Sequence, residues 1–440
     1  MLLNNPEMSH PRRHTSGSTS APSKAAVPHA PKADARLLAW KSLLRWDQGG
    51  VFAETLVAQH ARRFALSRSD RAMLQAMVYD TLRNRSWLEH VCQRLRDGAL
   101  DKDLRWLIML GLCQILILHY AEHAAVSETV SLAPKRARGL VNAVLRNAVR
   151  RRSELESERA SLPLHLRYST PEWLVNRWLA EFGPEETEAM LAWNVQTPPL
   201  YARLNPIHPM QVPDSWEPLP GLPLWYRVHG ALPAAELEAG QVYMADPSTS
   251  HCIRLLAPQP GEHLLDACAA PGGKSVAMIG ATGGDLHLLA TDLHEHRLPS
   301  LRDNLLRAGG VDVKVAQHDW SKPCPEEWKG RFDAVLLDVP CSNSGVLQRR
   351  VDARWRLSEE EITRLAELQL QILTCAAEAV RPGGRLVYST CSIDRAEDRE
   401  VVEAFLKQQP QFEFVEDYLA LPHREKADGA YAALLRRLTR

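Results

Sequence analysis

The stretch Asp266-Ala-Cys-Ala-Ala-Pro-Gly-Gly-Lys-Ser275 decides the fold of this chain. It follows a short apolar run that is typical of a β-strand, and it opens a run that is typical of a helix. Gly272 and Gly273 remove side chains where a ligand must lie against the backbone, and the N-terminus of the helix offers free N–H groups. This order of strand, glycine turn and helix predicts a cradle for a small molecule.

Two other glycine-rich motifs compete for the same stretch. Gly273-Lys274-Ser275 matches the end of a P-loop, but that pattern requires a glycine at the position of Cys268. The dinucleotide fingerprint G-x-G-x-x-G is absent. Both alternatives are therefore disfavoured. A third alternative is a glycine turn that serves only packing. Acidic residues at the ends of further strands argue against it.

Alternating strand and helix patterns continue from residue 246 to the C-terminus and indicate a parallel α/β sheet. The strands that we expect span residues 263–267, 287–291, 313–317, 332–337 and 385–389. Ligands of such sheets bind outside the carboxyl ends of the strands. The chemistry of this chain should therefore lie in the loops that follow these five segments.

Three aspartates occupy such positions. Asp292, Asp319 and Asp338 follow the second, third and fourth expected strands, and so converge on one crevice. A carboxylate at the second strand can hold both hydroxyls of a ribose, and one at the third can accept from an adenine amino group. Each aspartate alone would as readily be a loop or capping residue. Together with the glycine cradle, they favour an adenosyl ligand without a phosphate clamp.

Two cysteines lie at the same edge of the sheet. Cys341 follows the fourth strand in a P-C-S motif, and Cys391 ends the fifth in a T-C-S motif. We expect both thiols to face the crevice, beside Asp338. A lone buried cysteine is usually a small inert hydrophobe. That is our interpretation of three others, Cys92, Cys113 and Cys375.

Thiols in this position suit methylation of cytosine. Carbon 5 of cytosine cannot attack a sulfonium methyl group until carbon 6 has received a nucleophile. A thiolate makes that addition well when positive charge lowers its pKa, and Lys274 and the sulfonium are candidate sources of that charge. Asp338 can hydrogen-bond the ring nitrogen and amino group, which stabilises the charge that develops on addition. After transfer the carbon 5 proton leaves and the thiol is eliminated, a step that Cys341 is placed to assist.

From about residue 36 to the C-terminus the chain resembles the RsmB (Sun or Fmu) family of bacterial ribosomal RNA cytosine-5 methyltransferases. The pairing of a P-C-S motif with a later T-C-S motif is highly specific. The resemblance implies S-adenosyl-L-methionine as cofactor, Cys391 as covalent nucleophile and Cys341 as the residue that releases the product, with Asp338 and Lys274 beside them. The cofactor residues that it implies are Cys268, Ala269, Ala270, Pro271, Gly272, Gly273, Lys274, Asp292, Asp319 and Asp338.

A helical pattern over residues 35–152 precedes the sheet. Within it, Ser127-Glu-Thr-Val130 and Gly139-Leu-Val-Asn-Ala-Val-Leu-Arg146 look like the NusB-like RNA-binding domain of this family. That resemblance implies small-subunit (16S) ribosomal RNA as the substrate rather than transfer RNA. Clustered cations could contact phosphate or could simply complement a helix dipole at a solvated end. They are Lys135, Arg136, Arg138, Arg146, Arg150, Arg151 and Arg152.

The complete prediction is a class I (Rossmann-like) α/β methyltransferase domain behind two smaller domains. Residues 1–34 are rich in Pro, Ser, Ala and His and are expected to be a disordered leader. The NusB-like helical domain follows over 35–152 and a small α+β connecting domain over 153–245. Residues 246–440 form the S-adenosylmethionine-dependent methyltransferase domain.

Composition limits the partners and the cellular location that we expect for the protein. The chain has 53 basic and 53 acidic residues, so an RNA partner must be held by local basic patches. The eight cysteines show no C-x-x-C pair, which disfavours a zinc ribbon or a disulfide framework. No signal or membrane-spanning pattern occurs in the sequence. We therefore expect a cytoplasmic enzyme that binds no metal and no membrane, and that is a monomer.

The chain departs from the family pattern at three positions. Val351 stands where the family often has proline, Ala245 where it usually has glutamine, and Asp398 where asparagine is frequent. None of these positions is a predicted cofactor or thiol residue. The changes therefore concern which nucleotide is methylated rather than the type of reaction. The alternatives are a methyltransferase that acts on transfer RNA or on another ribosomal site, and a binding protein with a relic catalytic fold. The presence of both Cys341 and Cys391 argues against a relic.

Overall fold

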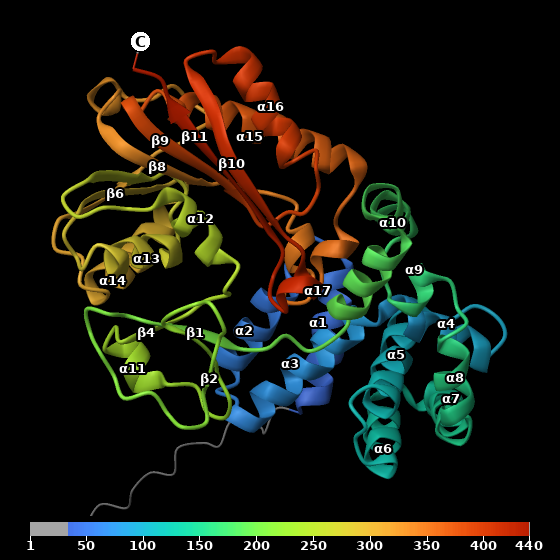
Figure 1. Cartoon of the computed structure of the whole chain (residues 1–440). Coiled ribbons are helices and arrows are strands. Elements are labelled where there is room, and N and C mark those ends of the chain that lie inside the picture. Colours follow the sequence, from blue (N-terminus) through green and yellow to red (C-terminus); the bar gives the residue numbers. More distant parts are fainter. Residues whose placement is uncertain (1–33, 440) are drawn as a thin grey trace, which may run out of the picture.

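The computed structural model describes residues 34–439. The leader expected over residues 1–34 therefore lies outside the described residues except for Asp34, whose side chain caps the first helix by accepting from the backbone N–H of Arg36 at 2.9 Å. Figure 1 shows helices at the start of the chain, a small sheet in the middle and a large sheet at the end.

Seven α-helices form the N-terminal domain, which we call the helical domain. They are α1 (Ala35–Asp47), α2 (Ala53–Arg63), α3 (Arg68–Arg83), α4 (Arg85–Leu95), α5 (Lys102–Leu116), α6 (Glu122–Leu132) and α7 (Arg138–Arg150). Every residue of α5 from Trp106 to Leu116 is buried. A helix that is apolar on all sides is stable only when surrounded, and α1, α3, α4, α6 and α7 pack around α5.

The middle of the chain combines helices with a four-stranded antiparallel sheet. Its helices are α8 (Arg152–Arg159), α9 (Leu164–Arg167), α10 (Glu172–Asn194) and α11 (Ala234–Glu238). Its strands are β1 (Tyr201–Leu204), β2 (Glu217–Pro218), β3 (Trp225–Arg227) and β4 (Val242–Met244), in the order β2-β3-β1-β4. Gly183 interrupts α10 with a φ of 80°, a conformation that glycine adopts without a steric penalty.

A seven-stranded sheet dominates the C-terminal part, in the order β10-β11-β9-β8-β5-β6-β7. The strands are β5 (His263–Asp266), β6 (His287–Asp292), β7 (Val313–Gln317), β8 (Phe332–Asp338), β9 (Val380–Thr390), β10 (Phe412–Ala420) and β11 (Ala430–Arg437). Strands β5 to β9 are parallel to one another, and β11 runs antiparallel to both β9 and β10. The predicted class I α/β fold is confirmed.

Helices cover both faces of this sheet (Figure 1). One apolar cluster joins the sheet to α12 (Thr249–Leu256), α13 (Gly273–Ala281) and α14 (Leu298–Arg307). A second joins it to α15 (Glu359–Ala377) and α16 (Arg399–Gln408). A short helix, α17 (Pro422–Glu425), separates β10 from β11. Because both faces are buried, the central strands are apolar throughout rather than alternating.

Four of the five expected strands lie within one residue of their predicted ends. The fifth is longer than expected, since β9 begins at Val380 instead of at residue 385. Strands β10 and β11 were not predicted. Within residues 34–439, no helix is both long enough and apolar enough to cross a membrane.

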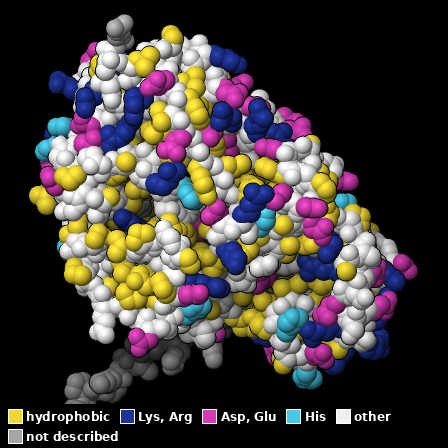
Figure 2. Space-filling view, viewed as in Figure 1, with side chains coloured by type: hydrophobic (Ala, Val, Ile, Leu, Met, Phe, Trp, Pro, Cys, Tyr) yellow, Lys and Arg dark blue, Asp and Glu magenta, His cyan; other side chains and the backbone are white. Residues whose placement is uncertain are grey.

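The surface carries charges of both signs. Figure 2 shows Lys and Arg side chains interspersed with Asp and Glu side chains over the face that is viewed, as the balance of 53 basic and 53 acidic residues leads one to expect. Any attraction for a polyanion must therefore come from a local group of basic residues.

Candidate active site

The glycine turn lies between β5 and α13, as predicted. Gly272 has a φ of 110°, and a Cβ atom there would come within 3.0 Å of Leu301 Cδ1. A Cβ atom on Gly273 would come within 3.1 Å of Tyr243 Cε1. Gly272 is favoured by its backbone conformation, and a side chain at either position would push against a neighbouring side chain.

This turn forms one wall of a crevice of about 230 Å³. Its lining includes most of the predicted cofactor residues, and they are Cys268, Ala269, Ala270, Pro271, Gly273, Lys274 and Asp338. Asp292 lies directly behind the turn, where it accepts from the backbone N–H groups of Ala270 at 3.3 Å and His294 at 2.9 Å. Asp319 does not line the crevice. Its carboxylate accepts from the backbone N–H and the hydroxyl of Ser321, at 2.9 and 2.6 Å.

Asp266 is a crevice residue whose role the sequence did not indicate. Its side chain is 1% exposed, and its Oδ2 accepts from the hydroxyl of Ser275 at 2.5 Å. Its Oδ1 is buried without a hydrogen-bond partner among the described residues. Burial raises the pKa of Asp266 to about 7. An unpartnered carboxylate oxygen beside a glycine cradle fits a ligand that carries a cationic group.

Lys274 and Asp338 form an ion pair across the crevice, with 2.7 Å between Nζ and Oδ2. Burial by itself lowers the pKa of Lys274, but the attraction of Asp338 outweighs it and raises that pKa above the ordinary value. The lysine therefore stays charged. Its pKa is raised further by the charges of Cys252 and Cys391, which places the ammonium group within electrostatic range of the second motif's cysteine.

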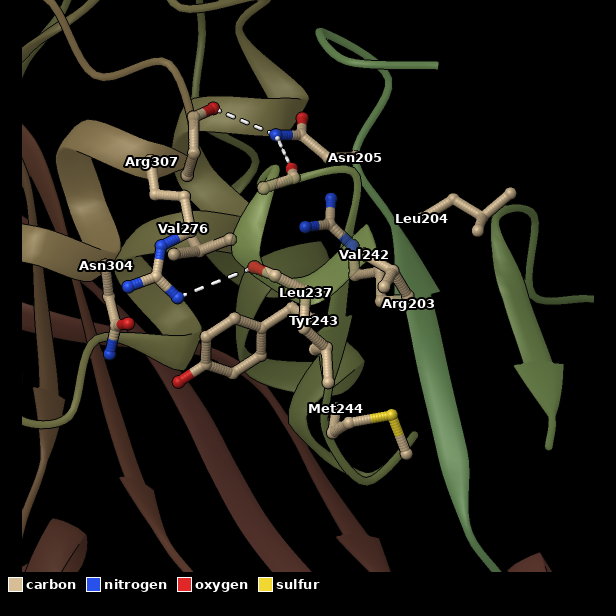
Figure 3. A pocket seen from close by; sticks show the side chains of 12 residues that line it. Arg203, Leu204, Asn205, Leu237, Val242, Tyr243, Met244, Val276, Asn304 and Arg307 are labelled. Carbon is tan, nitrogen blue, oxygen red and sulfur yellow. Dashed lines mark hydrogen bonds between the residues drawn. The ribbon is translucent and has the colours of Figure 1, made fainter. Parts of the chain in front are cut away.

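A second cavity, of about 340 Å³, lies behind the glycine turn between the small sheet and helices α13 and α14. Figure 3 shows Tyr243, Arg203 and Arg307 around it. Tyr243 also lines the crevice. Asn304 donates to the carbonyl of Pro271 at 2.8 Å. The small sheet and α14 thus support the turn from its outer side.

The two thiols of the P-C-S and T-C-S motifs lie together. The Sγ atoms of Cys341 and Cys391 are 3.1 Å apart, and Cys391 Sγ donates to Asn343 Oδ1 at 3.3 Å. The hydrogen bond to Cys391, and then burial, raise the pKa of Cys341 well above the ordinary value. Cys341 therefore keeps its proton and can donate it toward the neighbouring sulfur.

A buried glutamate joins the two cysteine loops. Glu397 is fully buried and accepts from Ser342 N at 2.8 Å, from the Ser392 hydroxyl at 2.8 Å and from Gln369 Nε2 at 2.9 Å. Ser342 and Ser392 are the residues that directly follow the two cysteines. Glu397 therefore fixes the spacing of the thiols. Its position shortly after the T-C-S motif is the only signal of it in the sequence.

A second network closes the crevice on the side of the small sheet. Arg349 donates to Asp246 at 2.8 Å and to Asp428 at 2.9 Å. Burial, and then the charge of Asp246, raise the pKa of Asp428 to about 7. The network connects the start of the catalytic domain, the loop after Cys341 and the turn before β11. No set of three His, Cys, Asp or Glu side chains suited to a metal ion occurs in residues 34–439.

Comparisons with known proteins agree with this geometry. The family described as "16S rRNA methyltransferase RsmB/F" matches residues 253–436, the NusB family matches residues 33–150, and an RsmF/B-like ferredoxin-like domain matches residues 170–210. "Ribosomal RNA small subunit methyltransferase B" of Salmonella typhi is 35% identical over 396 residues, which cover 83% of this chain and 90% of that protein. Its counterpart in Klebsiella pneumoniae is 36% identical over 403 residues, covering 84% and 91%.

Two solved structures share the fold. The crystal structure of PH0851 superposes with a TM-score of 0.73 at 22% identity and covers 94% of this chain and 100% of its own. A methyltransferase homolog protein from Pyrococcus horikoshii gives a TM-score of 0.55 at 23% identity, covering 63% and 99%. At these identities the likeness concerns the fold.

Proposed function

This chain belongs to the RsmB/F family of 16S rRNA methyltransferases, and from that premise we propose that it methylates carbon 5 of a cytosine in small-subunit ribosomal RNA with Cys391 as its nucleophile. It is an S-adenosylmethionine-dependent RNA methyltransferase. The observation that carries the proposal is the pair of thiols 3.1 Å apart. The two thiols do not line the crevice themselves, but Cys341 follows Asp338, which does line it, by three residues.

The crevice fits S-adenosylmethionine, which supplies a methyl group on a sulfonium when it is bound. The backbone from Cys268 to Gly273 would hold it against the turn, and the buried Oδ1 of Asp266 would pair with a cationic group. Asp292 would hold the ribose, because its position at the end of β6 corresponds to that of a ribose-binding carboxylate. We also propose that Asp319 accepts a hydrogen bond from the adenine amino group. To do so, Asp319 would give up the hydrogen bonds that it accepts from Ser321.

We assign each active-site side chain a separate role in the reaction of the cytosine. Cys391 adds to carbon 6 as a thiolate and makes carbon 5 nucleophilic, and Lys274 would supply positive charge near the reacting sulfur. Asp338 stabilises the charge that develops on the ring. After methyl transfer, carbon 5 gives up its proton to water, the electron pair of that C–H bond re-forms the double bond between carbons 5 and 6, and the bond from carbon 6 to sulfur breaks with its electrons returning to Cys391. Cys341, which retains its proton, assists that last step by donating a hydrogen bond to the departing sulfur.

The RNA would dock on the exposed face of α7. Arg138, Asn142, Arg146 and Arg150 are exposed at intervals of four residues and so form one stripe along the helix, which we call the α7 stripe. Arg146 and Arg150 form no ion pair within the described part of the chain, whereas Arg151 pairs with Glu154 and Arg152 with Glu156. The predicted basic cluster is therefore divided. The stripe is available to phosphate, and so are Lys135 and Arg136, which are exposed and form no ion pair among the described residues.

The organisation of the chain that we propose keeps the three domains at residues 35–152, 153–245 and 246–440. In support, α7 ends at Arg150 and the first helix of the catalytic part, α12, begins at Thr249. We further propose a monomer that acts in the cytoplasm. All eight cysteines are free thiols, and the proposed chemistry needs two of them reduced.

Bisulfite mapping of ribosomal RNA from a strain that lacks the gene tests this function. We expect one cytosine of the small-subunit RNA to lose its methyl group, and re-expression of the chain to restore it. Loss of a methyl group from a transfer RNA or from large-subunit RNA instead would favour the alternative substrates. An unchanged methylation pattern in every RNA would contradict the proposal.

A further inference from the structure

The segment that follows Cys341 is held in place by the helical domain. We call residues 342–357 the interdomain loop. It contains two short 3-10 turns, Ser344–Val346 and Ala353–Trp355, but no longer helix or strand. Its internal hydrogen bonds, such as that from the Arg350 N–H to the Val346 carbonyl at 2.8 Å, close short turns, and contacts with neighbouring segments fix how these turns lie in the molecule.

Asp352 makes the main polar contact between this loop and the helical domain. Its side chain is 4% exposed, and Oδ2 accepts from Trp46 Nε1 at 3.2 Å and from the backbone N–H of Ala53 at 2.8 Å. Trp46 lies in the last turn of α1 and Ala53 begins α2. The carboxylate therefore caps α2, where a negative charge is favourable, although it lies almost 300 residues away in the sequence.

Further contacts extend this junction along the loop. Arg83 donates to the carbonyl of Gln348 at 3.1 Å, and Trp355 Nε1 donates to the carbonyl of Leu82 at 3.0 Å. Val351, which stands where the family often has proline, belongs to the apolar core of the helical domain. The loop is thus part of both domains.

Arg354 adjoins this junction, joins the loop to the connecting domain and is completely buried. It donates to the carbonyls of Ser169 at 3.3 Å, Asn194 at 3.1 Å and Leu347 at 2.9 Å. No carboxylate pairs with it among the described residues, and burial lowers its pKa to about 9. A buried cation held only by carbonyls is costly, but it fixes three separate chain segments in one arrangement.

The other end of the loop is bound to the cysteine loops. The backbone N–H of Gly345 donates to the carbonyl of Cys391 at 3.0 Å, and that of Ile393 donates to the hydroxyl of Ser344 at 3.0 Å. Asn343 accepts from the thiol of Cys391. A continuous series of hydrogen bonds therefore runs from α1 and α2 through the loop to both thiols.

We propose that the helical domain positions the two active-site thiols through the interdomain loop, with Asp352 and Arg354 as positioning residues. This inference rests on the proposed function. It adds that the helical domain, which would dock the RNA, also completes the catalytic site. Loss of the junction should let the loop move and separate the thiols, while the α7 stripe and its affinity for RNA are unaffected.

The test uses the full-length chain and needs neither RNA nor cofactor for its first reading. Alkylation of Cys341 and Cys391 by iodoacetamide is followed by mass spectrometry relative to Cys375, a partly exposed thiol on α15. In Asp352→Ala we expect both active-site thiols to react about fivefold faster than in the wild type, because the loop opens locally. Asp352→Asn keeps an oxygen acceptor for both N–H groups and should restore the wild-type ratio.

Asp333→Ala is the matched control. Like Asp352, Asp333 accepts from one backbone N–H group and one side chain: from His263 at 2.8 Å and from Arg381 at 2.5 Å. It lies near the start of β8, at the end of the strand away from Cys341. Its replacement should leave the alkylation ratio unchanged. Should Asp352→Ala fail to fold, Trp355→Phe removes only the donor to Leu82 and allows the same measurement.

Steady-state methylation gives the second reading. Asp352→Ala should lower kcat by about tenfold, since small misplacements of reacting groups are costly, with an unchanged KM for RNA. An unchanged alkylation ratio in both junction variants would overturn the inference. Failure of the wild type to methylate ribosomal RNA would overturn the proposed function instead and leave the alkylation result standing.

Discussion

The Sγ atom of Cys341 lies 3.1 Å from that of Cys391, and the two thiols differ in their surroundings. The hydrogen bond to Cys391, together with burial, raises the pKa of Cys341. Cys391 instead lies within the electrostatic range of Lys274. The pair thus consists of one thiol that retains its proton and one that lies near a buried cation, and this difference supports Cys341 as the acid and Cys391 as the nucleophile.

Cofactor binding should strengthen with rising pH. The pKa of Asp266 is about 7 in the protein, so its carboxyl group is largely protonated at about pH 5.5 and half ionised at about pH 7. A cationic ligand binds the ionised form, and the affinity for S-adenosylmethionine should therefore rise on the order of tenfold between these pH values. Calorimetry at both pH values measures this. Asp266→Asn should bind more weakly and lose the dependence, and an equally steep dependence in that variant would exclude Asp266 as the source.

Asp292→Ala should weaken cofactor binding because the ribose would no longer be held. A charge-assisted hydrogen bond contributes about 1.5–3 kcal/mol, which corresponds to roughly a tenfold to hundredfold increase in Kd. Asp285→Ala serves as the control, because Asp285 is exposed and precedes the opposite end of β6. Equal affinity of Asp292→Ala and the wild type in calorimetry would contradict the placement of the ribose.

Neutralising the α7 stripe should flatten the salt dependence of RNA binding. Binding of each phosphate releases counterions, so the slope of log K against log salt should decrease by about 0.7 to 0.9 for each phosphate that the variant no longer binds. Arg146→Ala combined with Arg150→Ala is the test variant. Arg151→Ala combined with Arg152→Ala carries the same charge change, but these arginines already pair with glutamates and should have little effect. Equal slopes for both double variants would remove the stripe as the docking surface.

Much of the catalytic domain could be predicted because its signals are local. The turn at Gly272 has a backbone conformation that favours glycine, and β5, β6 and β8 are short apolar runs that end in recognisable loops. The sequences of β10 and β11 contain no comparable apolar run followed by a recognisable loop. β10 has exposed residues over much of its length, and its strand character depends on pairing with β11 rather than on its own pattern.

The supporting side chains of the site could not be derived from sequence. Glu397, Asp352 and Arg354 act through contacts with segments that lie far away in the chain, and no spacing rule reveals such contacts. Asp266 stood inside the quoted motif, but its burial and its unpartnered oxygen become visible only in three dimensions. The division of the basic cluster is different, because Glu154 and Glu156 stand three and four residues after their arginines, a spacing that predicts pairing on a helix.

Asp398 should destabilise the protein increasingly as the pH rises. It is 2% exposed, burial raises its pKa well above the ordinary value, and its Oδ2 has no partner among the described residues. An acid of this kind keeps its proton in the folded state while the unfolded chain releases it above about pH 4, so stability falls with increasing pH. Asp398→Asn, the residue frequent in the family, should raise the Tm more at about pH 8 than at about pH 5. An equal shift at both pH values would contradict this assignment.

The assignment of the two thiols is tested most directly by covalent trapping. Wild type, Cys341→Ala and Cys391→Ala are each incubated with substrate RNA and S-adenosylmethionine, and protein joined to RNA is sought as a slow band on a denaturing gel. If Cys391 attacks carbon 6 and Cys341 assists release, Cys341→Ala accumulates the band, because addition and methyl transfer proceed but elimination stalls. Cys391→Ala gives neither band nor methylation. The reverse pattern, a band in Cys391→Ala and none in Cys341→Ala, would contradict the account and make Cys341 the nucleophile.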